Sequence, residues 1–190
     1  MKEDGYKIRD QHGVYFITFS VVQWVDVFTR RCYIDTLLNS LQYCIKNKGL
    51  RIHAWCLMSN HLHLILSAEN GNLSGLLRDF KSFTAKEILQ QIAGNKEESR
   101  KSWMLWLFKQ AGSGNSRNEN SQFWQQDNQP VQLQTVEFTL IKLNYLHNNP
   151  VKAGIVDKAE NYLFSSARDY NGVTGLLPIE HLTAAYTLRH

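Results

Sequence analysis

Apolar positions along this chain fall into short continuous runs typical of strands and into the wider spacing typical of helices. Residues 14–22, VYFITFSVV, are β-branched and aromatic without a break, which predicts a strand buried on both faces. Residues 51–58 and 61–66 are two further β-rich runs. Only the polar pair Ser59-Asn60 separates them, so they predict a β-hairpin.

Three helices are predicted from apolar residues three or four positions apart. The first should begin after a Thr29 cap and end at Gly49, and the second should span residues 73–92. Their apolar stripes are Ile34, Leu37, Leu38, Leu41 and Ile45, and Leu73, Leu76, Leu77, Phe80, Phe83 and Ile88.

The third helix should start at a Thr135 cap and stop near Asn148, because Pro150 restricts the residue before it. Phe138, Ile141 and Tyr145 lie along one side of this helix and are expected to form its apolar stripe.

The remaining segments predict additions to this core. Residues 94–122 are expected to form an insertion with a short helix at about 100–110 and a flexible polar loop. Residues 123–133 predict an interrupted edge strand, because Pro130 cannot donate to a central ladder. Residues 151–190 form a C-terminal extension.

The order of these elements is strand, helix, strand, strand, helix, strand, helix. Its first six members predict an α+β, ferredoxin-like βαββαβ unit, an antiparallel four-stranded sheet with helices on one face and the histidine strand at its centre. We expect one domain over residues 1–190, with its core at about 14–150.

Composition indicates the cellular location of the protein but not its function. The 190 residues contain 21 Lys+Arg and 17 Asp+Glu, a net charge of +4 that is only mildly basic. The three cysteines have no metal-site spacing and cannot all pair with one another, and no apolar run is long enough to span a membrane. These features favour a reduced, cytoplasmic location and no membrane partner.

The first candidate site is His61-Leu62-His63. On a strand, residues i and i+2 point to the same side about 6.5 Å apart, so both imidazoles could converge on one ion. Neutral imidazole suits Mn, Zn, Ni or Cu better than Mg, although a mixed site can hold Mg. The pattern is common by chance, and two half-buried or surface histidines are the alternative.

The second candidate site is Tyr145-Leu146-His147-Asn148-Asn149-Pro150. A helix reaching Asn149 would place Tyr145 and Asn149 on one face, where a phenol could attack and an amide oxygen could complete a metal site. The alternatives are a core tyrosine and an ordinary helix stop. His147 should face away from Tyr145 and have a structural or DNA-facing role.

Together, SNHLHLIL, FWQQD, YLHNNPVKAGIV and YLFSSARDY resemble the REP-associated tyrosine transposase branch of the HUH (His-hydrophobic-His) single-strand DNA transposases. The resemblance implies the HUH nuclease fold, a divalent metal (Mg or Mn) bound by His61 and His63, and Tyr145 as the nucleophile. It assigns Asn149 as a third metal ligand. It also implies single-stranded or hairpin DNA as substrate, and a monomer or a homodimer as the active species.

Residues that could contact DNA are Arg78, Lys81 and Lys152, with Trp124 as an exposed aromatic for stacking. Three alternatives share these features: a metal-dependent nuclease or phosphodiesterase that uses water, a non-catalytic nucleic-acid-binding module on the same sheet, and a domesticated protein with a host role.

Overall fold

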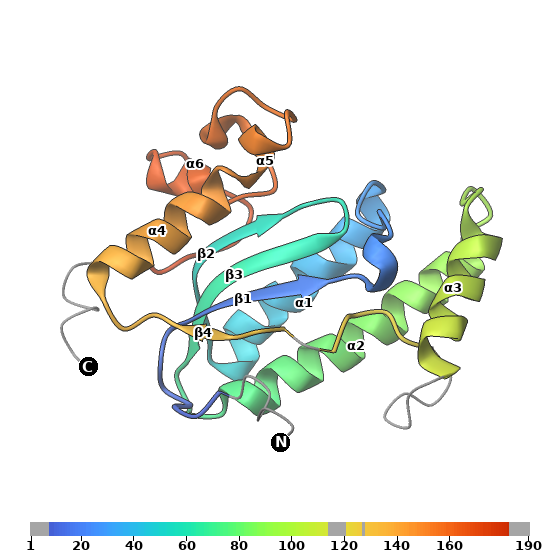
Figure 1. Cartoon of the computed structure of the whole chain (residues 1–190), viewed down its shortest axis with the longest axis horizontal. Coiled ribbons are helices and arrows are strands. Elements are labelled where there is room, and N and C mark those ends of the chain that lie inside the picture. The colour runs from blue at the N-terminus through green and yellow to red at the C-terminus, as the bar shows by residue number, and fades with distance from the viewer. Residues whose placement is uncertain (1–7, 114–120, 127, 183–190) are drawn as a thin grey trace, which may run out of the picture.

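A computed structural model describes residues 8–113, 121–126 and 128–182. Its centre is a four-stranded sheet in the order β2-β3-β1-β4 (Figure 1). All three strand pairs are antiparallel. The strands are β1 (Tyr15–Ser20), β2 (Leu50–Leu57), β3 (His61–Ala68) and β4 (Val131–Gln132). The predicted α+β, ferredoxin-like fold is therefore confirmed, and β3, the histidine strand, is an interior strand as expected.

The helices of the βαββαβ unit, α1 (Arg31–Lys48) and α2 (Leu73–Gly94), cover one face of the sheet (Figure 1). Leu62, Leu64 and Leu66 of β3 point into the core that these helices close. Helix α1 ends as predicted at Gly49, whose φ of 70° is the left-handed conformation that glycine adopts most easily.

Two details of this layer differ from the prediction. Arg30 caps α1 without a side-chain hydrogen bond, and the Thr29 hydroxyl instead donates to the Asp26 carbonyl, so the predicted Thr29 cap is wrong. Phe83 is exposed although it continues the apolar spacing of α2, whereas its neighbour Thr84 is fully buried and bonds within the helix. Helical spacing predicts that a buried face exists, but the packing partner decides its limits.

The insertion forms α3 (Lys101–Ser113), close to the predicted helix, while most of the predicted flexible loop falls on residues 114–120, outside the described residues. Glu98, whose side chain is fully buried, joins the insertion to the body through Arg30 at 2.7 Å, and Arg100 of the insertion binds the same carboxylate at 2.9 Å. The insertion is thus fixed to the loop before α1.

The opposite face of the sheet is covered by α4 (Val136–His147), followed by α5 (Asn149–Lys152) (Figure 1). The Thr135 hydroxyl accepts from Phe138 N at 3.2 Å, so the predicted cap is confirmed. Leu143 and Leu146 pack into this second core. The predicted apolar stripe is wrong, because Phe138, Ile141 and Tyr145 are all at least one-third exposed.

The expected edge strand is interrupted: β4 contains two residues, and Trp124 makes a separate bridge to Val21. The remaining short elements are η1 (Val22–Trp24), η2 (Ala159–Asn161) and α6 (Ala167–Tyr170). The three cysteines are free thiols. None of the helices in the described part of the chain is long and apolar enough to cross a membrane.

Candidate functional site

The two histidines of β3 lie side by side on the face of the sheet that α4 covers. Their ring centroids are 4.6 Å apart. Opposite them on β1, Thr18 pairs with His63 and Ser20 pairs with His61. Both imidazoles therefore lie on a rigid interior strand, where backbone pairing on both sides fixes their spacing.

The hydrogen-bond partners indicate which nitrogen of each ring carries the proton. Asn60 Oδ1 lies 2.7 Å from His61 Nδ1, and because an amide oxygen only accepts, the Nδ1–H of His61 donates. Thr18 Oγ1 lies 2.8 Å from His63 Nδ1. Asn149 Nδ2, which only donates, lies 3.2 Å from His63 Nε2, so Nε2 has the lone pair.

Asn149 reaches the histidines because helical backbone continues across the α4–α5 junction. Asn148 has φ −83° and ψ 0°, and its N–H bonds the Asn144 carbonyl while its own carbonyl accepts from Lys152 N–H. Asn149 thus lies about one turn beyond Tyr145. Its side chain also hydrogen-bonds His61, so one amide contacts both imidazoles.

Tyr145 lies beside this group. Its ring centroid is 5.3 Å from that of His63 and 6.0 Å from that of Phe16, in edge-on arrangements, and the residue is 42% exposed. The structure therefore brings together the four predicted site residues, which lie on α4, α5 and β3, and leaves the Tyr145 side chain accessible to a ligand.

Two lysines flank the phenol. Lys152 Nζ lies 5.7 Å from the Tyr145 ring centroid and Lys142 Nζ lies 6.0 Å from it. Lys142 also lies over Phe16, at 5.0 Å. The site thus has positive charge where an anionic phosphodiester could approach the hydroxyl.

Burial keeps both histidines neutral. It lowers the pKa of His63 to about 3, with smaller contributions from the charges of His61 and Lys142. Burial also lowers the pKa of His61, partly opposed by its hydrogen bond to Asn149. Neutral imidazole is the form that ligates metal ions, so neither ring needs to lose a proton first.

The donors present fit a divalent ion. They are the two imidazoles and the Asn149 amide oxygen, which would face the ion after the carboxamide turns over, because Nδ2 faces His63 here. Thr18 and Asn60 hold the histidine rings from behind, as outer partners of metal-bound histidines do. Within the described ranges no group of three His, Cys, Asp or Glu side chains could hold a metal, so this donor set is distinguished by an amide beside its two imidazoles.

Three of the four residues predicted to contact DNA do not lie at this site. Trp124 is only 4% exposed and donates from Nε1 to Thr84, so the expectation of an exposed aromatic is wrong. Lys81 Nζ bonds the Gln125 carbonyl and Asn128 Oδ1, so it is not presented to solvent together with Arg78. Arg78 is exposed beside Asp79, but it lies on α2, across the sheet from Tyr145. Of the four, Lys152 alone adjoins the site.

His147 is buried and its Nε2 lies 2.9 Å from Ser166 Oγ, which agrees with the structural role expected for it. The sequence reasoning missed Thr18 and Lys142. Thr18 could have been found from strand pairing alone, because a residue opposite His63 on β1 must share its face. No sequence signal separates Lys142 from the other lysines.

The family sequence model described as "Transposase IS200 like" matches residues 12–112, more than half of the chain. This chain belongs to the IS200-like transposase family. The resemblance suggested by the motifs is thus confirmed at the level of this family, and the matched region contains the histidine pair and ends before α4.

The fold of this IS200-like transposase is similar to that of a REP-associated tyrosine transposase, solved bound to a REP hairpin. The two chains are 18% identical with a TM-score of 0.63, over 96% of this chain and 94% of the other. A search of curated proteins gave no match. The similarity extends beyond the family match to α4 and the C-terminal segment, so the whole described chain shares one fold.

Proposed function

We propose that this IS200-like transposase cleaves and rejoins single-stranded or hairpin DNA through a 5′-phosphotyrosine intermediate, with Tyr145 as the nucleophile and with Mg²⁺ or Mn²⁺. The observation that carries the proposal is the position of Tyr145, an accessible phenol whose ring centroid lies 5.3 Å from that of a buried, neutral histidine. Hairpin DNA is also the ligand of the structurally similar transposase.

His61, His63 and Asn149 would hold the metal. When bound, a divalent ion acts as a Lewis acid that stabilises the negative charge on a phosphate under attack. The protein's own part is to keep both imidazoles deprotonated by burial and to hold them through Thr18 and Asn60.

Tyr145 would attack the scissile phosphorus. The bond from its Oη to phosphorus forms as the bond from phosphorus to the 3′-oxygen breaks, and the proton lost by the phenol balances the one gained by the 3′-oxygen. Lys142 and Lys152 flank the phenol and would bind the phosphate oxygens. Because the phosphotyrosine retains the phosphodiester linkage, a second 3′-hydroxyl can reverse the reaction and join a new strand.

The test follows the two ends of a cleaved strand. Hairpin oligonucleotides with randomised single-stranded flanks are incubated with protein and Mn²⁺, labelled at the 3′ or the 5′ end, and separated under denaturing conditions. We expect the 3′ label to migrate with the protein and the 5′ label to be released on a fragment with a free 3′-hydroxyl.

Tyr145→Phe should abolish the adduct and keep DNA binding, whereas Tyr43→Phe, at an exposed tyrosine of α1, should form the adduct in full. Cleavage without an adduct would overturn the proposal in favour of a water-using nuclease. Hairpin binding that withstands chelation, with no cleavage under any metal, would favour a non-catalytic module. A cytoplasmic setting and the choice between monomer and homodimer stay predictions.

A further inference from the structure

The loop between β1 and α1 has an unusual backbone directly beside His61. Gln23 and Trp24 have φ values of 54° and 55°, in the left-handed region that residues with a Cβ seldom adopt. Two such residues in succession persist only where the surroundings impose the conformation, and residues of this kind cluster at ligand sites.

The β2–β3 turn imposes this conformation from one side. Asn60 Nδ2 donates to the Trp24 carbonyl at 3.3 Å and to Asp26 Oδ1 at 2.9 Å. Ser59 Oγ donates to the same carboxylate oxygen at 2.6 Å. Because Asn60 also accepts from His61, one side chain fixes both the candidate metal ligand and the strained loop.

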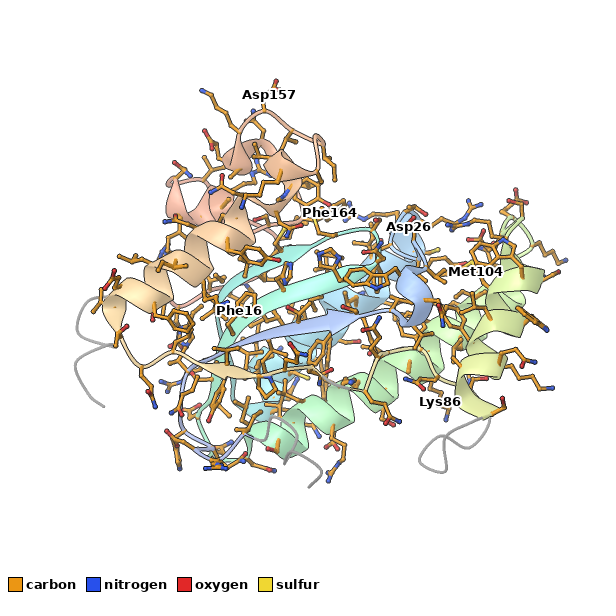
Figure 2. The ribbon with its side chains drawn as sticks, in the orientation of Figure 1. Phe16, Asp26, Lys86, Met104, Asp157 and Phe164 are labelled. Carbon is orange, nitrogen blue, oxygen red and sulfur yellow. The ribbon has the colours of Figure 1, made fainter. Side chains whose placement is uncertain are left out.

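The insertion holds the loop from the other side. Arg100 Nη1 donates to the Asp26 carbonyl at 2.7 Å, and the buried Glu98 carboxylate holds Arg100. Figure 2 labels Asp26 in this loop, on the side of the molecule where Met104 marks α3. The loop is therefore set in place before any ligand arrives.

What this rigid loop presents is the Trp24 indole. The residue is 57% exposed, and its ring centroid lies 5.7 Å from that of His61 in an edge-on contact. Trp55 and Trp124 are buried in the core, and the other exposed tryptophans, Trp103 and Trp106, lie on α3. The loop therefore presents an exposed aromatic ring directly beside the histidine pair.

We propose that Trp24 is a stacking platform for an unpaired nucleobase next to the phosphate bound at the His61–His63 site. This inference rests on the proposed function, because it takes single-stranded DNA as the ligand. Aromatic rings bind bases of single strands through their faces, without requiring a given sequence. Rigidity favours this role, since a fixed ring loses little freedom when a base stacks on it.

The experiment places 2-aminopurine, a fluorescent base, at successive positions of the hairpin oligonucleotide around its cleaved phosphate. Stacking changes the fluorescence of this base. With the wild-type protein, we expect one or two adjacent positions to be quenched. Trp24→Ala should remove that quenching and weaken binding of the strand roughly 5- to 150-fold.

Trp24→Tyr and Trp24→Phe should retain part of the quenching, whereas Trp24→Leu, which keeps apolar bulk but no aromatic face, should behave like the alanine variant. These aromatic replacements also show that loss in Trp24→Ala does not arise from a collapsed loop. The matched control is Tyr43→Ala, which removes an equally exposed aromatic ring on the other face of the sheet and should change neither quenching nor affinity.

Equal quenching and affinity in the wild type and Trp24→Ala would overturn the inference, and so would a Trp24→Leu variant that binds like Trp24→Tyr. The adduct assay decides the proposed function separately. A wild-type adduct with unchanged binding in Trp24→Ala refutes only the stacking role. Position-specific quenching that depends on Trp24, without any adduct, supports the stacking role and refutes the chemistry.

Discussion

Asn149 Nδ2 lies 3.2 Å from His63 Nε2, although 86 positions separate the two residues along the chain. The contact joins α5, which continues directly from the helix that carries Tyr145, to the interior strand β3. It also places an amide against the histidine pair, where a third imidazole or a carboxylate could have stood.

Replacing Asn149 should weaken metal binding specifically. We expect Asn149→Ala to lower the affinity for Mn²⁺ by at least about 10- to 100-fold, because the loss of a direct donor should cost no less than the loss of an outer hydrogen-bond partner of a ligand. Asn149→Asp should restore or tighten binding, since a carboxylate oxygen suits Mn²⁺ and Mg²⁺ well. Calorimetric titration measures both. Asn148→Ala is the control, because that exposed side chain bonds the Asn144 carbonyl, and an equal loss there would contradict the assignment.

Thr18 should matter through the orientation of His63. Thr18→Val keeps the shape of the side chain but removes the hydroxyl 2.8 Å from His63 Nδ1, so the ring loses the partner that fixes its proton. We expect cleavage or Mn²⁺ affinity to fall about 10- to 100-fold with the fold intact. Thr18→Ser, which retains the hydroxyl, should recover most of the loss. A fully active valine variant would show that this bond does not position the ring.

The lysines beside Tyr145 should bind phosphate. For Lys152→Gln, we expect weaker binding of single-stranded DNA and a salt dependence, as log affinity against log salt concentration, that is shallower by about 0.7. Fluorescence anisotropy over a range of NaCl concentrations measures this slope. Lys86→Gln removes an exposed charge from α2, on the opposite face, and should leave the slope unchanged (Figure 2). Equal slopes in all three proteins would exclude a phosphate contact at Lys152.

Glu98 should make stability depend on acid pH. Hydrogen bonds from Arg100 and Arg30 outweigh its burial and lower the pKa of this carboxyl to about 2, from an ordinary value of 4.5. The folded state therefore favours the carboxylate, so the stabilisation is complete above pH 4.5 and is lost as the pH falls through about 2. We expect Glu98→Gln to lower the free energy of unfolding at pH 7 by about 1.5–3 kcal/mol.

Urea unfolding at several pH values measures this difference, which should shrink steadily between pH 4.5 and 2. Glu97→Gln replaces the neighbouring exposed carboxylate and should change stability by less than about 0.5 kcal/mol. If the Glu98→Gln deficit persisted unchanged at pH 2, packing rather than charge would explain the role of Glu98.

The sequence by itself determined the local structure and the chemical groups available. The β-rich runs and apolar spacing predicted the strands and helices, and the HLH run placed both imidazoles on one side of an interior strand. These features follow from periods of two and 3.6 residues, which are properties of the backbone and need no knowledge of distant contacts.

Only the tertiary structure decided which face of each element is covered. The spacing of Phe138, Ile141 and Tyr145 indicates a buried stripe, yet α4 packs through Leu143 and Leu146 and so leaves Tyr145 open to a ligand. Two tryptophans differ in burial for the same reason, although the sequence alone does not distinguish them. Trp124 is buried in the core, and Trp24 is exposed beside His61. Burial depends on the partner across the interface, and that partner comes from a remote part of the chain.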